Sequence, residues 1–171
     1  MNDFSNVASF YEIERKFLVV NDSYKKKAFK KIRIAQGYII DTPEKTIRIR
    51  IVDNKAWLTI KGPSFDGGMS RFEWEKSISY MDACALMVMC EGNIIVKDRY
   101  LVVVGIHIFE VDDFLETNDG LVMAEIELGR ATECFELPSW AGTEVTGNEK
   151  YYNAYLALHP YQTWQEDEKV I

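Results

Sequence analysis

The sequence has little histidine and little cysteine. Two histidines among 171 residues argue against a histidine-rich metal site. The three cysteines are Cys84, Cys90 and Cys134, an odd number without C-x-x-C spacing. We therefore expect free thiols in a reducing compartment and no zinc site.

Long apolar runs and a secretory leader are also missing. No window approaches 18 apolar residues, and the N-terminus has no basic segment followed by an apolar run. The sequence therefore predicts a cytoplasmic protein that makes no membrane contact. The net charge of −7 argues against nonspecific nucleic-acid binding, which needs a basic surface. The 20 lysines and arginines are still enough to form a local basic site.

The composition that remains is typical of one globular domain. Hydrophobic residues make up 47% of the chain and aromatic residues 13%, as in ordinary folded proteins. A chain of 171 residues is expected to form a single domain that buries about two-thirds of its unfolded surface. Trp57 and Trp74 are candidates for a homodimer contact, and the sequence leaves the oligomeric state open.

Charged and apolar residues alternate in the stretch 11–20. As a strand, this stretch places Glu12, Glu14 and Lys16 on one side, about 7 Å from one to the next, and apolar residues mostly on the other. Carboxylate oxygens are ligands that Mg²⁺ prefers, and a base beside them suits the phosphates that accompany the ion. A solvated strand face is the alternative for this segment taken alone.

The same alternation recurs along the chain. It predicts strands over residues 11–20, 36–41, 45–52, 55–61, 71–78, 94–104, 106–114 and 121–128. Helical spacing and cap residues predict helices over residues 24–35, 80–91 and 150–158. Composition predicts a loop over residues 62–68, a short helix or turn near residues 137–138, and a loose C-terminal tail.

The polar faces of these strands hold eight carboxylates and seven bases. The carboxylates are Glu12, Glu14, Glu73, Glu75, Glu110, Asp112, Glu125 and Glu127. The bases are Lys16, Arg48, Arg50, Lys61, Arg71, Lys97 and Arg99. Because three helices cover only part of the apolar faces, we expect an α+β fold in which a closed, eight-stranded antiparallel β-barrel turns its charged faces inward.

A dry lumen with this many charges would be unstable, since desolvating an unpaired ion costs several kcal/mol. We therefore expect a wet lumen whose occupants are a polyanion and its metal ions. Arginine binds phosphate oxygens with a two-pronged fork, and carboxylates hold divalent cations. An open sheet, with its charged side in water and its apolar side on helices, is the alternative.

An ordered series of short motifs runs from residue 11 to residue 158. The first is Glu12-Ile13-Glu14-Arg15-Lys16. The others are Gln36-Gly37-Tyr38, Ile47-Arg48-Ile49-Arg50, Leu58-Thr59-Ile60-Lys61-Gly62, Arg71-Phe72-Glu73-Trp74-Glu75, Lys97-Asp98-Arg99-Tyr100, Phe109-Glu110-Val111-Asp112, Ala124-Glu125-Ile126-Glu127-Leu128 and residues 144–153. As a set they resemble the CYTH domain, or triphosphate tunnel metalloenzyme family, whose signature is Glu-x-Glu-x-Lys. The domain core then covers about residues 11–158, and residues 159–171 form a C-terminal tail.

The resemblance implies an eight-stranded tunnel that binds a triphosphate together with Mg²⁺ or Mn²⁺. The implied metal ligands are Glu12, Glu14, Asp112, Glu125 and Glu127. The implied triphosphate-binding bases are Lys16, Arg48, Arg50, Lys61, Arg71, Lys97, Arg99 and Lys150, the last standing where the family usually has arginine. The implied catalytic groups are Lys16 paired with Tyr38 near the reacting phosphate, and Glu75 near a second ion or the attacking water.

The Gln36-Gly37-Tyr38 and Val145-Thr146-Gly147 segments resemble the short bacterial triphosphatases of this family. The resemblance therefore implies metal-dependent hydrolysis of inorganic triphosphate to pyrophosphate and phosphate. Two alternatives remain. One is a hydrolase or cyclase acting on an organic triphosphate such as ATP or thiamine triphosphate. The other is a noncatalytic polyphosphate- or nucleotide-binding module, which would not need the four metal-binding glutamates.

Overall fold

The computed structural model describes residues 11–165. Its strands are β1 (Tyr11–Val19), β2 (Lys30–Thr42), β3 (Lys45–Val52), β4 (Lys55–Phe65), β5 (Ser70–Ile78), β6 (Glu91–Val104), β7 (His107–Phe114), β8 (Val122–Glu127) and β9 (Ala141–Glu144). Its α-helices are α1 (Ser23–Lys27), α2 (Tyr80–Met87) and α3 (Asn153–Leu158). Short 3₁₀ helices are η2 (Asp66–Gly68), η3 (Glu116–Asn118), η4 (Glu149–Tyr151) and η5 (Tyr161–Thr163). No helix among these residues is long and apolar enough to span a bilayer.

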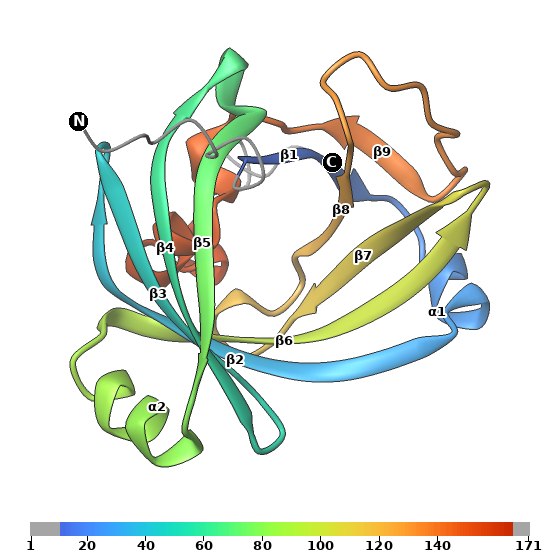
Figure 1. The fold of residues 1–171 in the computed structure, drawn as a ribbon. Coiled ribbons are helices and arrows are strands. Elements are labelled where there is room, and N and C mark those ends of the chain that lie inside the picture. Colours follow the sequence, from blue (N-terminus) through green and yellow to red (C-terminus); the bar gives the residue numbers. More distant parts are fainter. Residues whose placement is uncertain (1–10, 166–171) are drawn as a thin grey trace, which may run out of the picture.

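The first strand closes the sheet into a barrel. Antiparallel pairing follows the order β5-β4-β3-β2-β6-β7-β8-β1, and β1 also pairs with β5 (Figure 1). Residues 14–18 of β1 pair with β8, whereas residues 11–13 pair with β5. The ninth strand, β9, adds to the edge of β1 next to residues 17–19. The predicted closed, eight-stranded antiparallel barrel is therefore confirmed, and β9 is an extra strand.

The predicted helix over residues 24–35 is wrong. The helix α1 ends at Lys27, and Ala28 already has an extended backbone. From Lys30 onward the chain is β2, in which Ile32 and Ile34 lie opposite Arg99 and Lys97 of β6. The Lys-rich segment has an apolar period of two that the helical interpretation overlooked. Two smaller differences are that β4 continues into the expected loop, as far as Phe65, and that β9 was not predicted.

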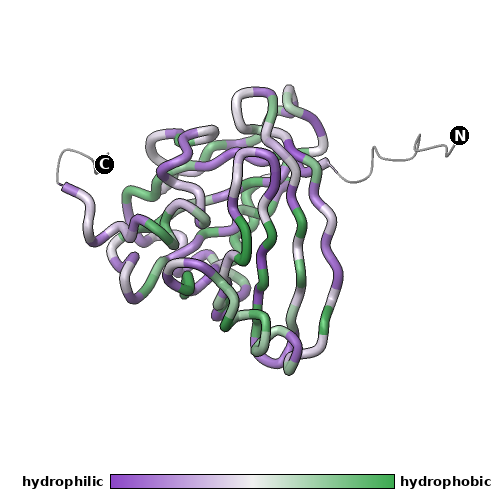
Figure 2. Tube along the Cα trace, turned by 90° about the vertical axis from the view of Figure 1, so that its left-hand side faces the viewer, coloured by the Kyte–Doolittle hydropathy of each residue, from purple (hydrophilic) through white to green (hydrophobic). Residues whose placement is uncertain are grey.

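Three apolar clusters stabilise the barrel, and two of them lie on its outside. Figure 2 shows apolar and polar residues alternating along the strands, as the sequence predicts. The helix α2 packs on the outer side of β3 and β4, over Ile49 and Ala56. Elsewhere the outer face is covered by Tyr24 of α1 and by the segment before β9, which contributes Phe135 and the fully buried Trp140.

The third cluster fills one end of the barrel. Here the inward faces of the strands change from charged to apolar, with Leu18, Ile95, Phe114 and Met123 packed under residues of α3. Residues 161–163 form η5, and Trp164 is buried against Tyr151 in the same cluster. Residues 159–165 are thus part of the packed structure and not a loose tail, whereas residues 166–171 lie outside the described residues.

Candidate active site

The inward faces of the strands surround a cavity of about 630 Å³. Its lining includes ten of the predicted site residues, contributed by six different strands: Glu12, Glu14, Lys16, Tyr38, Arg48, Arg50, Lys61, Arg71, Lys97 and Arg99. Two further predicted metal ligands, Glu125 and Glu127 of β8, also line it. Alternation along each strand is what turns these side chains inward, because side chains two residues apart share a face. The structure therefore gathers most of the predicted residues around one space.

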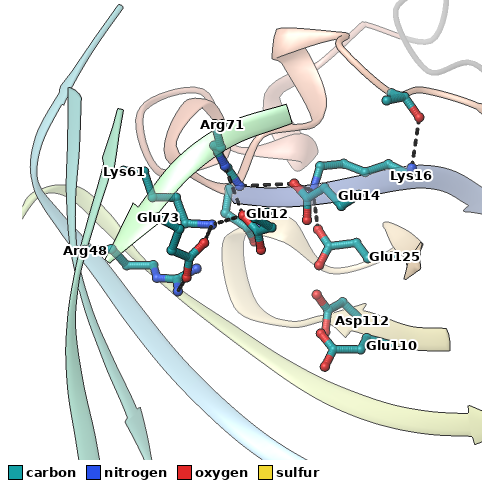
Figure 3. A network of polar contacts seen from close by, with 12 residues as sticks. Glu12, Glu14, Lys16, Arg48, Lys61, Arg71, Glu73, Glu110, Asp112 and Glu125 are labelled. Atoms are coloured by element: carbon teal, nitrogen blue, oxygen red, sulfur yellow. Dashed lines mark hydrogen bonds and ion pairs between the residues drawn. The ribbon is translucent and has the colours of Figure 1, made fainter. Parts of the chain in front are cut away.

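On β1, Lys16 lies between two carboxylates. Its Nζ is 2.8 Å from Glu14 Oε1 and 2.5 Å from Glu125 Oε1 across the strand pair (Figure 3). Burial alone would lower the pKa of Lys16, but the charges of Glu125 and Glu14 outweigh it and raise that pKa. The ammonium of Lys16 is therefore held charged beside the carboxylates.

One wall of the cavity, formed by β4 and β5, contributes Lys61 and Arg71. The Nζ of Lys61 is 2.8 Å from Glu12 Oε2 and 2.5 Å from Glu73 Oε2. The guanidinium of Arg71 reaches Glu12 at 3.1 Å and Glu14 at 3.0 Å (Figure 3). Burial and the nearby charge of Arg48 lower the pKa of Lys61, because together they outweigh the opposing charges of Glu12 and Glu14.

Beside them on β3, two arginines meet one carboxylate of β5. Arg48 and Arg50 contact Glu75 Oε2 at 3.3 and 2.8 Å, and Thr59 donates to the same oxygen at 2.7 Å. Burial and the charge of Arg48 lower the pKa of Arg50. Glu75 is exposed and does not line the cavity, so in this structure it contacts the arginines from outside the cavity lining.

The opposite wall, formed by β6 and β7, holds a buried ionic cluster. Arg99 contacts both carboxylate oxygens of Asp112 at 2.6 Å, reaches Glu125 at 3.0 Å and also pairs with Glu110. Lys97 Nζ lies 2.5 Å from Asp112 Oδ2. Asp112 is fully buried and does not line the cavity, so it lies behind the two bases.

Glu127 differs from the other carboxylates of the cavity. Among residues 11–165 no lysine or arginine forms an ion pair with it. Burial raises the pKa of Glu127, and so do the charges of four nearby carboxylates: Glu12, Glu110, Glu73 and Glu14. A cluster of carboxylates with an excess of negative charge and hard oxygen donors is chemically suited to a divalent cation.

The geometry around these carboxylates is that of ion pairs. Within the described part of the chain, no three carboxylate, histidine or cysteine groups are close enough together to enclose a metal ion. Glu12 and Glu14 instead contact Lys61, Arg71 and Lys16. The donor chemistry fits a divalent cation, and the carboxylates that would hold it, apart from Glu127, now share their charge with bases.

Tyr38 is placed differently from the expectation. It lines the cavity and is buried, but its hydroxyl contacts Gln36 and not Lys16. Gln36 Nε2 donates to Tyr38 Oη at 2.7 Å, while Lys16 Nζ is engaged by Glu14 and Glu125. The expected Lys16–Tyr38 pair is therefore absent from the contacts of residues 11–165.

Lys150 lies away from the other bases. It belongs to η4, and its Nζ is 5.6 Å from the centre of the Trp164 ring. It is not among the residues that line the cavity. Its expected role in phosphate binding gains no support from this geometry and stays a prediction.

With this geometry in view, comparisons with known proteins identify the family. A family model described as the CYTH domain matches residues 11–155. The chain belongs to the CYTH family. This CYTH domain is 42% identical over 156 residues to a protein named inorganic triphosphatase from Acetivibrio thermocellus, covering 91% of this chain and 98% of that protein. A second protein with the same name, from Nitrosomonas europaea, is 33% identical over 152 residues, covering 86% of this chain and 97% of that protein.

Solved structures resemble this CYTH domain as well. A crystal structure of an inorganic triphosphatase has 29% identity and a TM-score of 0.60, covering 86% of this chain and 94% of that one. A protein from Pyrococcus horikoshii has a TM-score of 0.58 and 21% identity, covering 70% of this chain and 79% of that one. This second likeness shows the fold alone.

Several lining residues of the CYTH domain were not singled out from its sequence. Asp41 and Thr46 flank the β2–β3 turn, and Tyr152 and Asn153 come from the start of α3. Asn153 Oδ1 lies 3.4 Å from Lys97 Nζ, at the end of the cavity that the apolar cluster closes. Thr46 shares the inward face of β3 with Arg48 and Arg50 but carries no charge, whereas the other three positions lie at the ends of elements that tertiary packing brings to the cavity.

The other end of the cavity has an apolar lip, which we define as Leu101, Ile106 and Ile108 of the β6–β7 hairpin. Ile106 is 91% exposed and Ile108 is 48% exposed. His107 also lines the cavity here, and its Nε2 lies 2.9 Å from Glu133. Charge-based reasoning could not find the lip, since it continues the inward face of β6 and β7 with uncharged residues.

Lys97 yields a prediction about stability and pH. Burial lowers the pKa of Lys97 to about 8 from 10.5, and Arg99 acts in the same direction, although Asp112 opposes both. Between these two values the unfolded chain binds the proton and the folded chain does not, so this group stabilises the fold increasingly as the pH rises. Relative to Lys97→Met, the wild type is expected to gain about 2 kcal/mol in free energy of unfolding between about pH 7.5 and pH 10.

Urea denaturation of both proteins at the two pH values measures this difference. Comparing the two proteins cancels groups that titrate equally in both. A difference that stays constant with pH would mean that Asp112 keeps Lys97 protonated in the folded state.

Proposed function

We propose that this chain hydrolyses inorganic triphosphate to pyrophosphate and phosphate inside the barrel, with Mg²⁺ or Mn²⁺ as cofactor. The main support is the cavity itself, which brings seven bases and seven carboxylates of the strands into one space. The bases are Lys16, Arg48, Arg50, Lys61, Arg71, Lys97 and Arg99, and the carboxylates are Glu12, Glu14, Asp41, Glu73, Glu110, Glu125 and Glu127. The names of the two curated relatives support the same substrate. Seven bases on converging walls suit a small polyanion.

The bases of the two walls would bind the phosphate oxygens. Arg48, Arg50 and Lys61 approach from β3 and β4, and Lys97 and Arg99 from β6. Phosphoryl transfer needs little covalent chemistry from a protein, so positioning and stabilisation of charge on the phosphoryl oxygens supply most of the catalysis. Ion pairs outside the cavity lining, such as Glu75 with Arg50, would hold the arginines in place before the ligand arrives.

Glu12, Glu14, Glu125 and Glu127 would hold the cation. When bound, a divalent cation supplies charge neutralisation at the phosphate oxygens and acidifies a bound water. Carboxylates that now pair with bases would contact the cation instead, and those bases would then be available to bind the phosphate oxygens. We therefore expect triphosphate and cation to strengthen each other's binding.

Activity measurements on the purified chain test the proposal. We expect phosphate release from inorganic triphosphate with a kcat/KM at least about tenfold above that for ATP or thiamine triphosphate, because no base-reading group lies among the charged lining residues. Chelation should abolish release, and Mg²⁺ or Mn²⁺ should restore it. Faster turnover of an organic triphosphate would show that inorganic triphosphate is not the preferred substrate. The organic group would then contact the apolar lip. Binding without turnover in either metal would indicate a noncatalytic module.

We also propose a cytoplasmic location. Cys84, Cys90 and Cys134 are free thiols in the structure, as suits a reducing compartment. A homodimer stays a prediction that size-exclusion chromatography with light scattering would test.

A further inference from the structure

The contact between Gln36 and Tyr38 determines where the tyrosine proton points. Both side chains are buried on the inward face of β2, Gln36 with 1% and Tyr38 with 7% of its surface exposed. Gln36 Nε2 donates to Tyr38 Oη at 2.7 Å. The phenol oxygen therefore acts as an acceptor toward Gln36, and its own proton is left for another partner.

That other partner is not a protein group within residues 11–165, where Tyr38 Oη makes no second hydrogen bond. Tyr38 lines the cavity, so the proton is directed at the space where a ligand would lie. The charges of Arg48 and Arg71 act on this hydroxyl, which places it among the bases proposed to bind phosphate.

We infer that Gln36 is a positioning residue, which holds the Tyr38 hydroxyl as a hydrogen-bond donor toward a phosphoryl oxygen of the bound triphosphate. This inference rests on the proposed function and deepens it. Within residues 11–165 the contacts of the Lys16 ammonium are to Glu14 and Glu125, whereas the hydroxyl of Tyr38 contacts Gln36.

The protonation of Tyr38 agrees with a donor role. Burial raises the pKa of Tyr38 to about 12, although Arg48 and Arg71 act to lower it. The hydroxyl is therefore neutral at ordinary pH and cannot serve as a base. A neutral donor near a phosphoryl oxygen stabilises the negative charge that the reaction places there.

The backbone of Gln36 is fixed within the sheet, and its side chain is almost fully buried. Its backbone pairs with Arg50 of β3 on one side and Ile95 of β6 on the other, so it lies in the interior of the sheet. A fixed donor can orient the hydroxyl before the substrate binds, whereas a mobile one would have to be ordered during the reaction.

A double-mutant cycle on triphosphate hydrolysis tests the inference. We expect Tyr38→Phe to lower kcat by about 100-fold and Gln36→Leu by about tenfold, both with KM changed less than about twofold. In the Tyr38→Phe background, Gln36→Leu should change kcat by less than about twofold, because its effect passes through the hydroxyl. Gln36→Met, which keeps an unbranched side chain of similar length, should reproduce Gln36→Leu and serves if the leucine variant does not fold.

Asn118→Ala is the matched control for loss of a buried amide. Asn118 is also 1% exposed, and its Oδ1 accepts a hydrogen bond from the Tyr161 backbone at 2.8 Å, away from the cavity. This variant should lower the melting temperature and leave kcat unchanged.

The possible failures are distinguishable. A wild-type chain without triphosphatase activity would reject the proposed function. An active wild type in which Gln36→Leu acts equally in both backgrounds, or changes only KM or the melting temperature, would overturn the positioning role alone. Unchanged kcat in Tyr38→Phe would also overturn it.

Discussion

The substitution Glu14→Gln is expected to lower kcat for inorganic triphosphate by about 100- to 1,000-fold. It should also raise the Mg²⁺ concentration needed for half of the maximal rate. Glu14 lies opposite Glu127 in the β1–β8 pair, and its Oε1 contacts Lys16 and Arg71. The amide keeps the shape of the side chain but removes a negative charge from the carboxylates proposed to hold the cation.

Phosphate release measured against Mg²⁺ concentration gives both quantities. Glu144→Gln is the matched control, because Glu144 of β9 is exposed and pairs with Arg15 on the outside of the barrel. That variant should stay within about twofold of wild type, since exposed ion pairs contribute little. If Glu14→Gln kept the wild-type rate and Mg²⁺ dependence, the assignment of Glu14 to the cation would be wrong.

The second large effect concerns stability. Asp112→Asn is expected to lower the free energy of unfolding by about 3–5 kcal/mol, because it removes the carboxylate that neutralises two buried bases. Lys97 would lose the one ion pair that residues 11–165 offer it, and Arg99 would keep only Glu110 and Glu125. Chemical denaturation measures the loss.

Two further variants isolate the cause. Asp98→Asn removes a carboxylate whose partners, Lys31 and Arg33, are more than half exposed, so it should cost less than about 1 kcal/mol. Combining Asp112→Leu with Lys97→Leu should recover part of the stability, because an apolar pair needs no neutralisation. Equal losses for Asp112→Asn and Asp98→Asn would contradict the account of the buried cluster.

The barrel could be predicted because the alternation of charge in eight strands admits few arrangements that keep apolar faces covered. The segment 24–35 shows the limit of that reasoning. Six lysines and arginines between residues 25 and 33 obscure the alternation of Ile32 and Ile34. This segment is a strand because it pairs with β6, a contact that the local sequence does not reveal. The strand β9 has four residues and no alternation of apolar and polar side chains, so its local sequence does not predict a strand.

For the candidate site, the sequence predicted correctly which charged residues of regularly alternating strands turn inward. Lys61 and Arg71 line the cavity, as strand parity requires. The position of a side chain along the barrel axis could not be predicted, because alternation in a strand determines which face the side chain lies on and not how far along the barrel it lies. Asp112 and Glu75 share the inward face but do not line the cavity, since Asp112 is buried behind its bases and Glu75 is exposed. Gln36 went unassigned because an uncharged amide gives no signal.

The closing of the ring by the first strand has a consequence for how the molecule is made. Glu14 meets Glu127 only after the chain has grown through seven further strands. Pairings so distant in sequence form slowly, and a growing polypeptide folds from its N-terminal end as it leaves the ribosome. A growing chain that ends before β8 can pair only residues 11–13 of β1, with β5, so the catalytic space is completed only after β8 has been made.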